Sequence, residues 1–125
     1  MKKMLIVDDS SELRSILLLT FSYGSFEMLQ AENGLQAITL AEHEKPEVII
    51  LDIMMPQMDG LEVCRKIKAI PALANSFIII LTSLDSHCDK KEALDAGADC
   101  YMTKPFNPVE ILAVISNITK KSIIA

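Results

Sequence analysis

The sequence predicts an α/β fold: one domain, residues 1–125, built on an open, doubly wound parallel sheet. Five short apolar runs recur along the chain, and segments with helical apolar spacing separate them. Four of the runs are near-continuous rather than alternating, which is typical of strands covered on both faces, as in parallel sheets. The chain has 125 residues, of which 50% are hydrophobic, so it is large enough to bury its own core.

Each expected strand is a run of apolar or β-branched residues that stops at polar ones. In chain order these are residues 4–7 (MLIV), 26–29 (FEML), 48–51 (VIIL), 77–81 (FIIIL) and 100–102 (CYM). Runs of this length, bounded by turn residues, favour strands over helices.

Helical spacing of apolar residues follows each of these runs. The positions are Leu13, Ile16, Leu17, Thr20 and Phe21; Leu35, Ile38 and Ala41; Leu61, Cys64 and Ile67; Ala93, Leu94 and Ala96; and Ile111, Leu112, Val114, Ile115 and Ile118. Gly24 and Gly97 are expected to end helices, while Asn107, Pro108 and Glu110 form a start signal for the last one. A strand–helix unit repeated five times needs right-handed crossovers, and its ligand site lies beyond the carboxyl ends of the strands.

Composition excludes several classes of protein. The net charge of -5 argues against a general nucleic-acid surface, which needs clustered lysine and arginine. The three cysteines are odd in number and lack a CxxC pattern, so neither a disulfide framework nor a zinc site is indicated. No apolar run approaches the roughly 20 residues that span a bilayer, and acids come too early for a signal peptide. We therefore expect a cytoplasmic protein without membrane contact.

Chemically active residues stand at the ends of four expected strands. Asp8 and Asp9 follow the first, Asp52 the third, Thr82 the fourth, and Lys104 comes shortly after the fifth. Taken singly, each has an ordinary structural explanation. Asp8 and Asp9, with Ser10, could cap the first helix, and Asp52 could be a turn residue. Thr82 could be a β-former or a cap, and Lys104 could be one solvated lysine. Because the carboxyl ends of parallel strands share one edge, all of these residues should meet there.

Three carboxylates at one edge need a counter-charge, because at about 5 Å each pair repels by roughly 3 kcal/mol at an effective dielectric constant near 20. Mg²⁺ prefers such oxygen ligands and bridges protein acids to phosphates. Asp8 and Asp9, as a pair, suit the metal, whereas Asp52 stands alone and is the candidate nucleophile for phosphoryl transfer. Thr82 would donate a hydroxyl to a phosphoryl oxygen, and Lys104 would neutralise the remaining charge.

Four motifs together resemble response-regulator receiver domains of two-component signalling, over nearly the full length of the chain. They are LIVDDS at 5–10, LDIMMPQMDG at 51–60, LTS at 81–83 and YMTKPF at 101–106. The intervals from Asp52 to Thr82, from Thr82 to Tyr101 and from Tyr101 to Lys104 are also typical of that family. No single motif is specific, but the combination is.

The resemblance implies a flavodoxin-like sheet of strand order 2-1-3-4-5 and a phosphorylation switch rather than an enzyme. A histidine kinase or histidine phosphotransfer protein would phosphorylate Asp52, with Mg²⁺ held by the three aspartates and the carbonyl of Met54. The peptide bond before Pro105 is expected to be cis, which aims Lys104 inward. Thr82 would move toward the phosphate and Tyr101 would fill the space. Residues 85–120, covering the fourth helix, fifth strand and fifth helix, would contact a downstream protein, as a monomer or a phosphorylation-dependent dimer.

Other functions remain open at this point. We expect a stand-alone receiver, and the alternative is a receiver from a larger hybrid kinase or transcription factor. An aspartyl-phosphate phosphatase is disfavoured, because enzymes resembling haloacid dehalogenases carry DxD after the first strand. A flavin or nucleotide carrier is disfavoured by the acidic first loop, which lacks a phosphate cradle.

Overall fold

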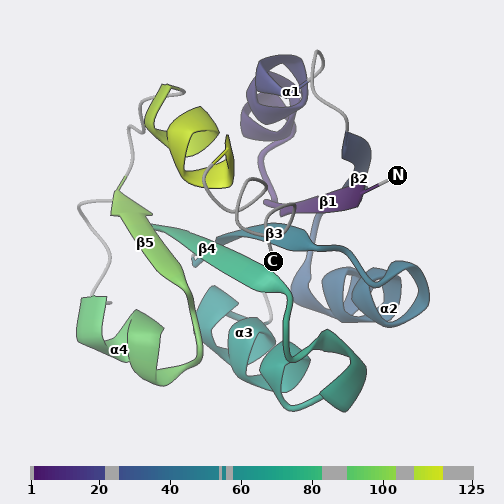
Figure 1. Ribbon diagram of the computed structural model, residues 1–125, viewed down its shortest axis with the longest axis vertical. Coiled ribbons are helices and arrows are strands. Elements are labelled where there is room, and N and C mark those ends of the chain that lie inside the picture. Colours follow the sequence, from purple (N-terminus) through teal and green to yellow (C-terminus); the bar gives the residue numbers. More distant parts are fainter. Residues whose placement is uncertain are drawn as a thin grey trace.

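The sheet has five parallel strands, as the computed structural model in Figure 1 shows. The structure describes residues 2–21, 26–53, 55, 58–82, 90–103 and 109–116. The strands are β1 Lys2–Val7, β2 Phe26–Ala31, β3 Val48–Asp52, β4 Phe77–Thr82 and β5 Cys100–Thr103. All five expected strands are confirmed, and each extends the predicted run by one or two residues at one end or the other.

Strand order is β2-β1-β3-β4-β5, which confirms the order implied by the resemblance. The register places Val7 of β1 beside Leu51 of β3, and Asp52 beside Leu81 of β4. β2 lies on one side of β1 and β3 on the other, so the connections that leave β1 and β2 run in opposite directions across the sheet. The carboxyl ends of β1 and β3 are therefore adjacent at the point where doubly wound sheets bind ligands.

Helices cover both faces of the sheet. The described helices are α1 Ser11–Thr20, α2 Gly34–Glu44, α3 Gly60–Lys68, a short 3₁₀ helix Pro71–Leu73, α4 Lys90–Asp95, and a helix at residues 109–116. In Figure 1, α1 and the yellow helix at 109–116 lie above the sheet, and α2, α3 and α4 lie below it. No helix in the described ranges is long and apolar enough to cross a membrane.

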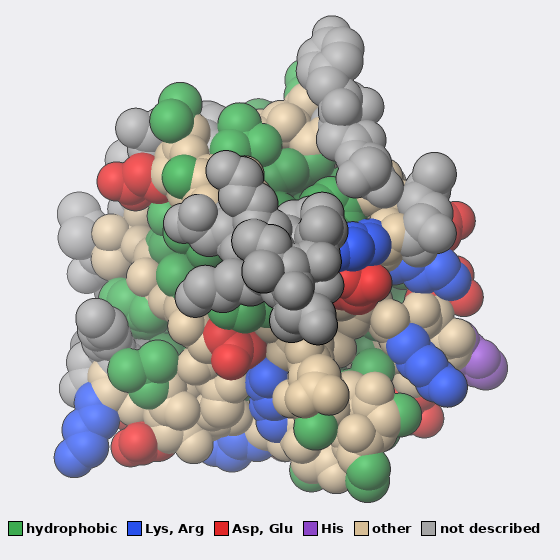
Figure 2. Space-filling view, in the orientation of Figure 1, with side chains coloured by type: hydrophobic (Ala, Val, Ile, Leu, Met, Phe, Trp, Pro, Cys, Tyr) green, Lys and Arg blue, Asp and Glu red, His purple; other side chains and the backbone are tan. Residues whose placement is uncertain are grey.

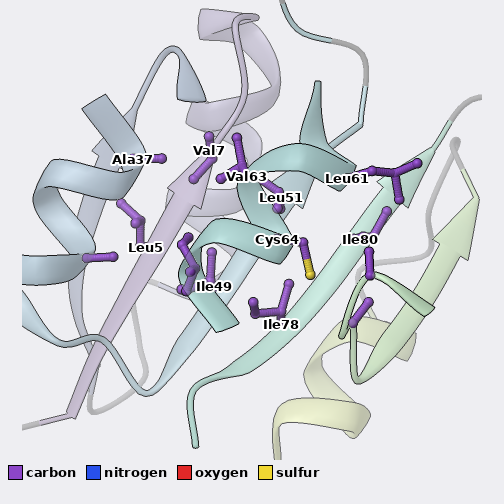
Figure 3. Close-up of a cluster of buried hydrophobic side chains, with 14 of the residues drawn as sticks. Leu5, Val7, Ala37, Ile49, Leu51, Leu61, Val63, Cys64, Ile78 and Ile80 are labelled. Atoms are coloured by element: carbon purple, nitrogen blue, oxygen red, sulfur yellow. The ribbon is translucent and has the colours of Figure 1, made fainter. Parts of the chain in front are cut away.

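Strand side chains alternate between two buried clusters, one on each face. Leu5, Ile49 and Ile78 pack with α2, α3 and α4, whereas the neighbouring Met4 and Ile50 pack with α1 and the helix at 109–116. Figure 3 shows the first cluster, in which Ala37 of α2 and Val63 and Cys64 of α3 lie over the strands. Burial on both faces explains the continuous apolar runs of β1, β3 and β4, whereas the edge strands β2 and β5 are only partly buried.

Several apolar residues at helical spacing face outward instead of toward the core. These are Ile16, Leu35, Leu94 and Leu112, all at least 42% exposed. On α2 the buried positions are the small residues Gly34, Ala37 and Ala41, and a Cβ at Gly34 would lie 2.6 Å from Cγ2 of Val63 in α3. Hydrophobic atoms are correspondingly visible over α1 and the 109–116 helix at the top of Figure 2.

Helix boundaries follow local signals where the structure describes them. Asp59 caps α3 by accepting a hydrogen bond from the backbone N–H of Glu62 at 2.9 Å. Gly97 has a φ of 103°, a conformation that favours glycine, just after α4. The predicted signals at Gly24, Asn107 and Pro108 lie outside the described residues.

At the amino end of the sheet, Lys68 joins three segments. Its Nζ donates to the backbone carbonyl of Ser76 at 2.6 Å and to Oδ2 of Asp99 at 3.1 Å. The same Asp99 oxygen accepts from the backbone N–H of Ile78 at 2.9 Å. The end of α3, the start of β4 and the start of β5 are therefore fixed to one another at the edge opposite the acidic residues.

Candidate functional site

The acidic residues emerge from two adjacent strands at the carboxyl edge of the sheet. Asp8 directly follows β1, and its backbone N–H still donates to the carbonyl of Ala31 in β2, at 3.1 Å. Asp52 is the last residue of β3. Because β1 and β3 are hydrogen-bonded neighbours in register, the two side chains leave the sheet at nearly the same height.

Asp8, Asp9 and Asp52 form one cluster. One carboxylate oxygen from each can be chosen so that all three lie within 4.8 Å of one another. Asp8 and Asp52 are buried, at 2% and 4% exposure, whereas Asp9 is exposed. This arrangement of hard oxygen donors, two fixed and one accessible to solvent, fits the ligand preferences of Mg²⁺.

Electrostatic repulsion within this cluster is substantial. At 4.8 Å, two full charges repel by about 3.5 kcal/mol at an effective dielectric constant of 20. That estimate applies best to Asp8 and Asp52, since water screens the exposed Asp9. A cation placed among the three oxygens would turn this repulsion into attraction.

The loop carrying Asp8 and Asp9 is held by local hydrogen bonds. Oδ1 of Asp8 accepts from the backbone N–H of Ser10 at 2.8 Å. Ser10, rather than either aspartate, caps α1 by accepting from the N–H of Leu13 at 3.3 Å. Capping by Ser10 explains how both carboxylates can face the cluster, so the helix-cap explanation fits Ser10 and not its neighbours.

Arg14 contacts the loop that carries the aspartates, although no sequence motif pointed to it. Its Nη1 donates to the backbone carbonyl of Asp8 at 2.6 Å, and its Nε donates to Oε1 of Gln30 in β2 at 3.2 Å. The sequence shows only that an arginine stands one turn into the helix that follows the two aspartates. Nothing in the sequence indicated that its side chain turns back toward the loop.

The packing of α3 against the end of β3 requires a glycine at position 60. The backbone N–H of Ile53 donates to Leu81 at 3.0 Å, and the N–H of Gly60 donates to the carbonyl of Ile53 at 2.9 Å. A Cβ atom at Gly60 would lie 2.5 Å from the carbonyl oxygen of Asp52. The start of α3 therefore packs directly against the backbone of the candidate nucleophile, which fixes its position.

Thr82 and Tyr101 are related through the pairing of β4 with β5. Thr82 is fully buried at the end of β4, and Tyr101 pairs with Ile80, two residues earlier. Side chains two residues apart share a face, so Thr82 and Ile80 point to the α3 and α4 side of the sheet. Tyr101 is half-buried and packs against the cluster on that same side.

The remaining predicted site residues lie outside the described part of the chain. These are Met54, Lys104 and Pro105, so the carbonyl ligand, the phosphate-pairing lysine and the cis peptide bond all stay predictions. Of the cysteines, Cys64 is buried, Cys100 is half-buried, and neither is in a disulfide. Burial raises the pKa of the Cys64 thiol to about 11.

Comparison with known proteins gives a consistent result. Residues 4–116 match the family model of the response regulator receiver domain. The chain is 39% identical over 124 residues to the alkaline phosphatase synthesis transcriptional regulatory protein PhoP of Bacillus subtilis, covering 99% of this chain and 51% of that protein. The chain thus spans about half the length of the curated relatives it matches.

Solved structures agree with the sequence matches. Chemotaxis protein CheY4 of Vibrio cholerae has a TM-score of 0.85 at 32% identity, covering 94% of this chain and 98% of that one. The receiver domain of Francisella response regulator 1452 has a TM-score of 0.86 at 30% identity, covering 98% and 99%. The family match, the sheet order and these structural likenesses lead to one conclusion: the chain belongs to the response regulator receiver domains of two-component signalling.

Proposed function

We propose that this chain is a cytoplasmic phosphorylation switch whose phosphoryl acceptor is Asp52. The observation that carries the proposal is the convergence of Asp8, Asp9 and Asp52, with ligand atoms within 4.8 Å of one another at the carboxyl edge of the sheet. Receiver domains are signalling domains rather than classical enzymes, so the chemistry expected here is the phosphorylation and dephosphorylation of the chain itself.

Asp52 is suited to the acceptor role because Gly60, at the start of α3, packs directly against its backbone carbonyl and holds it in place. In the proposed step, a carboxylate oxygen of Asp52 attacks the phosphorus of a phosphohistidine on a kinase or phosphotransfer protein. The P–O bond of an acyl phosphate forms as the P–N bond breaks, and the departing imidazole takes up a proton. Phosphoryl transfer of this kind depends on positioning and charge stabilisation.

Asp8, Asp9, Asp52 and the carbonyl of Met54 would hold Mg²⁺, which supplies positive charge to the phosphoryl oxygens when it is bound. Lys104 would pair with the phosphate. Thr82 would donate its hydroxyl to a phosphoryl oxygen. Tyr101, on the same side of the sheet, would then occupy the space that Thr82 leaves, which carries the signal to α4, β5 and the helix at 109–116.

The test is Mg²⁺-dependent incorporation of phosphate from acetyl phosphate. The parent should label in MgCl₂ and not in EDTA, and Asp52→Asn should not label. Asp59→Asn is a matched control, because Asp59 is a nearby aspartate in the sequence whose side chain caps α3. If Asp52→Asn labels as well as the parent, the acceptor is another residue.

Two forms of output are candidates. In the first, the receiver acts alone by contacting a downstream protein, without direct nucleic-acid binding. In the second, it controls a domain attached to it, which is favoured by the similarity to a transcriptional regulator about twice as long. In Figure 2, acidic and basic side chains are interspersed on the visible face of the described residues, which suits protein contact better than a nucleic-acid surface.

A further inference from the structure

The guanidinium group of Arg14 connects three elements beside the acidic cluster. It extends from the first turns of α1, donates through Nη1 to the Asp8 carbonyl at 2.6 Å, and donates through Nε to Gln30 Oε1 at 3.2 Å. Gln30 belongs to β2 and pairs with Ile6 of β1. The loop that carries Asp8 and Asp9 is thus tied both to the helix after it and to the neighbouring strand.

The short bond to Asp8 has a direct consequence for the carboxylates. Asp8 is fixed at three points: its N–H by Ala31, its carbonyl by Arg14, and its Oδ1 by the N–H of Ser10. With both backbone groups held, its side chain leaves the backbone in one direction, toward Asp52. Arginine suits this role better than lysine, because its planar group reaches two acceptors at once in a rigid geometry.

We propose that Arg14, together with Gln30, is a positioning residue for divalent-cation binding by the Asp8, Asp9 and Asp52 cluster. This inference rests on the proposed function and assigns a residue outside the predicted ligand set. Arg14 touches neither the cation nor the phosphoryl group. It holds the loop so that the aspartates are already close together before the cation binds, which reduces the ordering that binding requires.

The test uses variants that leave the charge unchanged. Gln30→Met removes one acceptor at an exposed position, and Arg14→Lys keeps the positive charge but loses the rigid two-point contact. Mg²⁺ dissociation constants are measured on the full chain by NMR titration with MgCl₂, which also reports whether each variant is folded. Each variant should bind Mg²⁺ about tenfold more weakly, the lower end of the effect of removing such outer partners from metal sites.

Non-additivity separates positioning from a general loss of stability. Both substitutions break the same contact between Arg14 and Gln30. The double variant should therefore bind Mg²⁺ no more weakly than whichever single variant has the lower Mg²⁺ affinity. Arg65→Lys, at an exposed position on α3, is the matched control and should bind like the parent. If Arg14→Lys does not fold, Gln30→Met decides alone.

Three results would overturn the inference: Mg²⁺ affinity equal to the parent in either folded single variant, additive losses in the double variant, or an equal loss in Arg65→Lys. Failure of the proposed function would look different. In that case the parent itself would show no Mg²⁺-dependent change at the amides of residues 8–10, and Asp52→Asn would label normally with acetyl phosphate.

Discussion

Replacing Asp8 by asparagine should make the metal-free protein more stable and abolish its stabilisation by Mg²⁺. Asp8 and Asp52 are both buried, with oxygens within 4.8 Å, so their repulsion is about 3.5 kcal/mol at an effective dielectric constant of 20. Asparagine retains an Oδ1 acceptor for the Ser10 N–H, so the loop geometry survives. Other charges and water around the cluster reduce this repulsion, and we therefore expect a net gain of about 1–2 kcal/mol in the free energy of unfolding.

Urea unfolding followed by circular dichroism measures both effects. In EDTA, Asp8→Asn should unfold at a higher urea concentration than the parent. In MgCl₂ at ten times the dissociation constant, the parent should gain about 1.4 kcal/mol, and the variant should gain almost nothing. Glu42→Gln, an exposed position on α2, makes the same change in net charge as a control. A variant no more stable than the parent in EDTA, or equally stabilised by Mg²⁺, would refute the electrostatic reasoning.

Three further predictions concern the fold around the site. Gly60→Ala should lower the free energy of unfolding by about 1–3 kcal/mol in urea titrations, because its Cβ would meet the Asp52 carbonyl at 2.5 Å; an unchanged midpoint would contradict that packing. Lys68→Met should lower the free energy of unfolding by about 1–3 kcal/mol, because it removes hydrogen bonds from a charged donor. Lys66→Met, on the exposed side of the same helix, should change it by less than about 0.5 kcal/mol. Equal losses of stability in the two variants would argue against the Lys68 network. Cys64 has its pKa raised to about 11, so the folded state keeps a proton that the unfolded chain releases above about 9. Stability should thus fall between pH 9 and 11, by less in Cys64→Ala than in the parent, and parallel pH profiles would rule out this linkage.

The central strands were predictable because a strand buried on both faces appears in the sequence as a continuous run of apolar residues. Runs such as VIIL at 48–51 have no polar alternation, a pattern that is typical of short strands covered on both faces. The strand ends were predictable for a related reason: a buried run that stops at Asp52 must deliver that side chain to the edge of the sheet. Caps such as Asp59 were readable because the interaction spans only three residues.

Helix orientation was less accessible from sequence. Leu35 and Ile16 have the spacing of core residues but lie on the surface. On α2 the inward face is formed by the small residues Gly34, Ala37 and Ala41, which hydrophobicity alone did not distinguish from Leu35. The bridge from Arg14 to Gln30 was equally inaccessible. Its two partners lie 16 positions apart, on a helix and a strand that are brought together only by the crossover between β1 and β2.

By itself, the sequence determined which residues form strands, which residues end them, and hence which side chains reach one edge, because each of these depends on neighbours in the chain. Only the tertiary structure decided how near the carboxylates of Asp8, Asp9 and Asp52 come to one another and what holds them there. Those distances depend on the pairing of β1 with β3, on Gly60 against the Asp52 backbone, and on a side chain that returns from α1, all of them contacts between segments far apart in sequence.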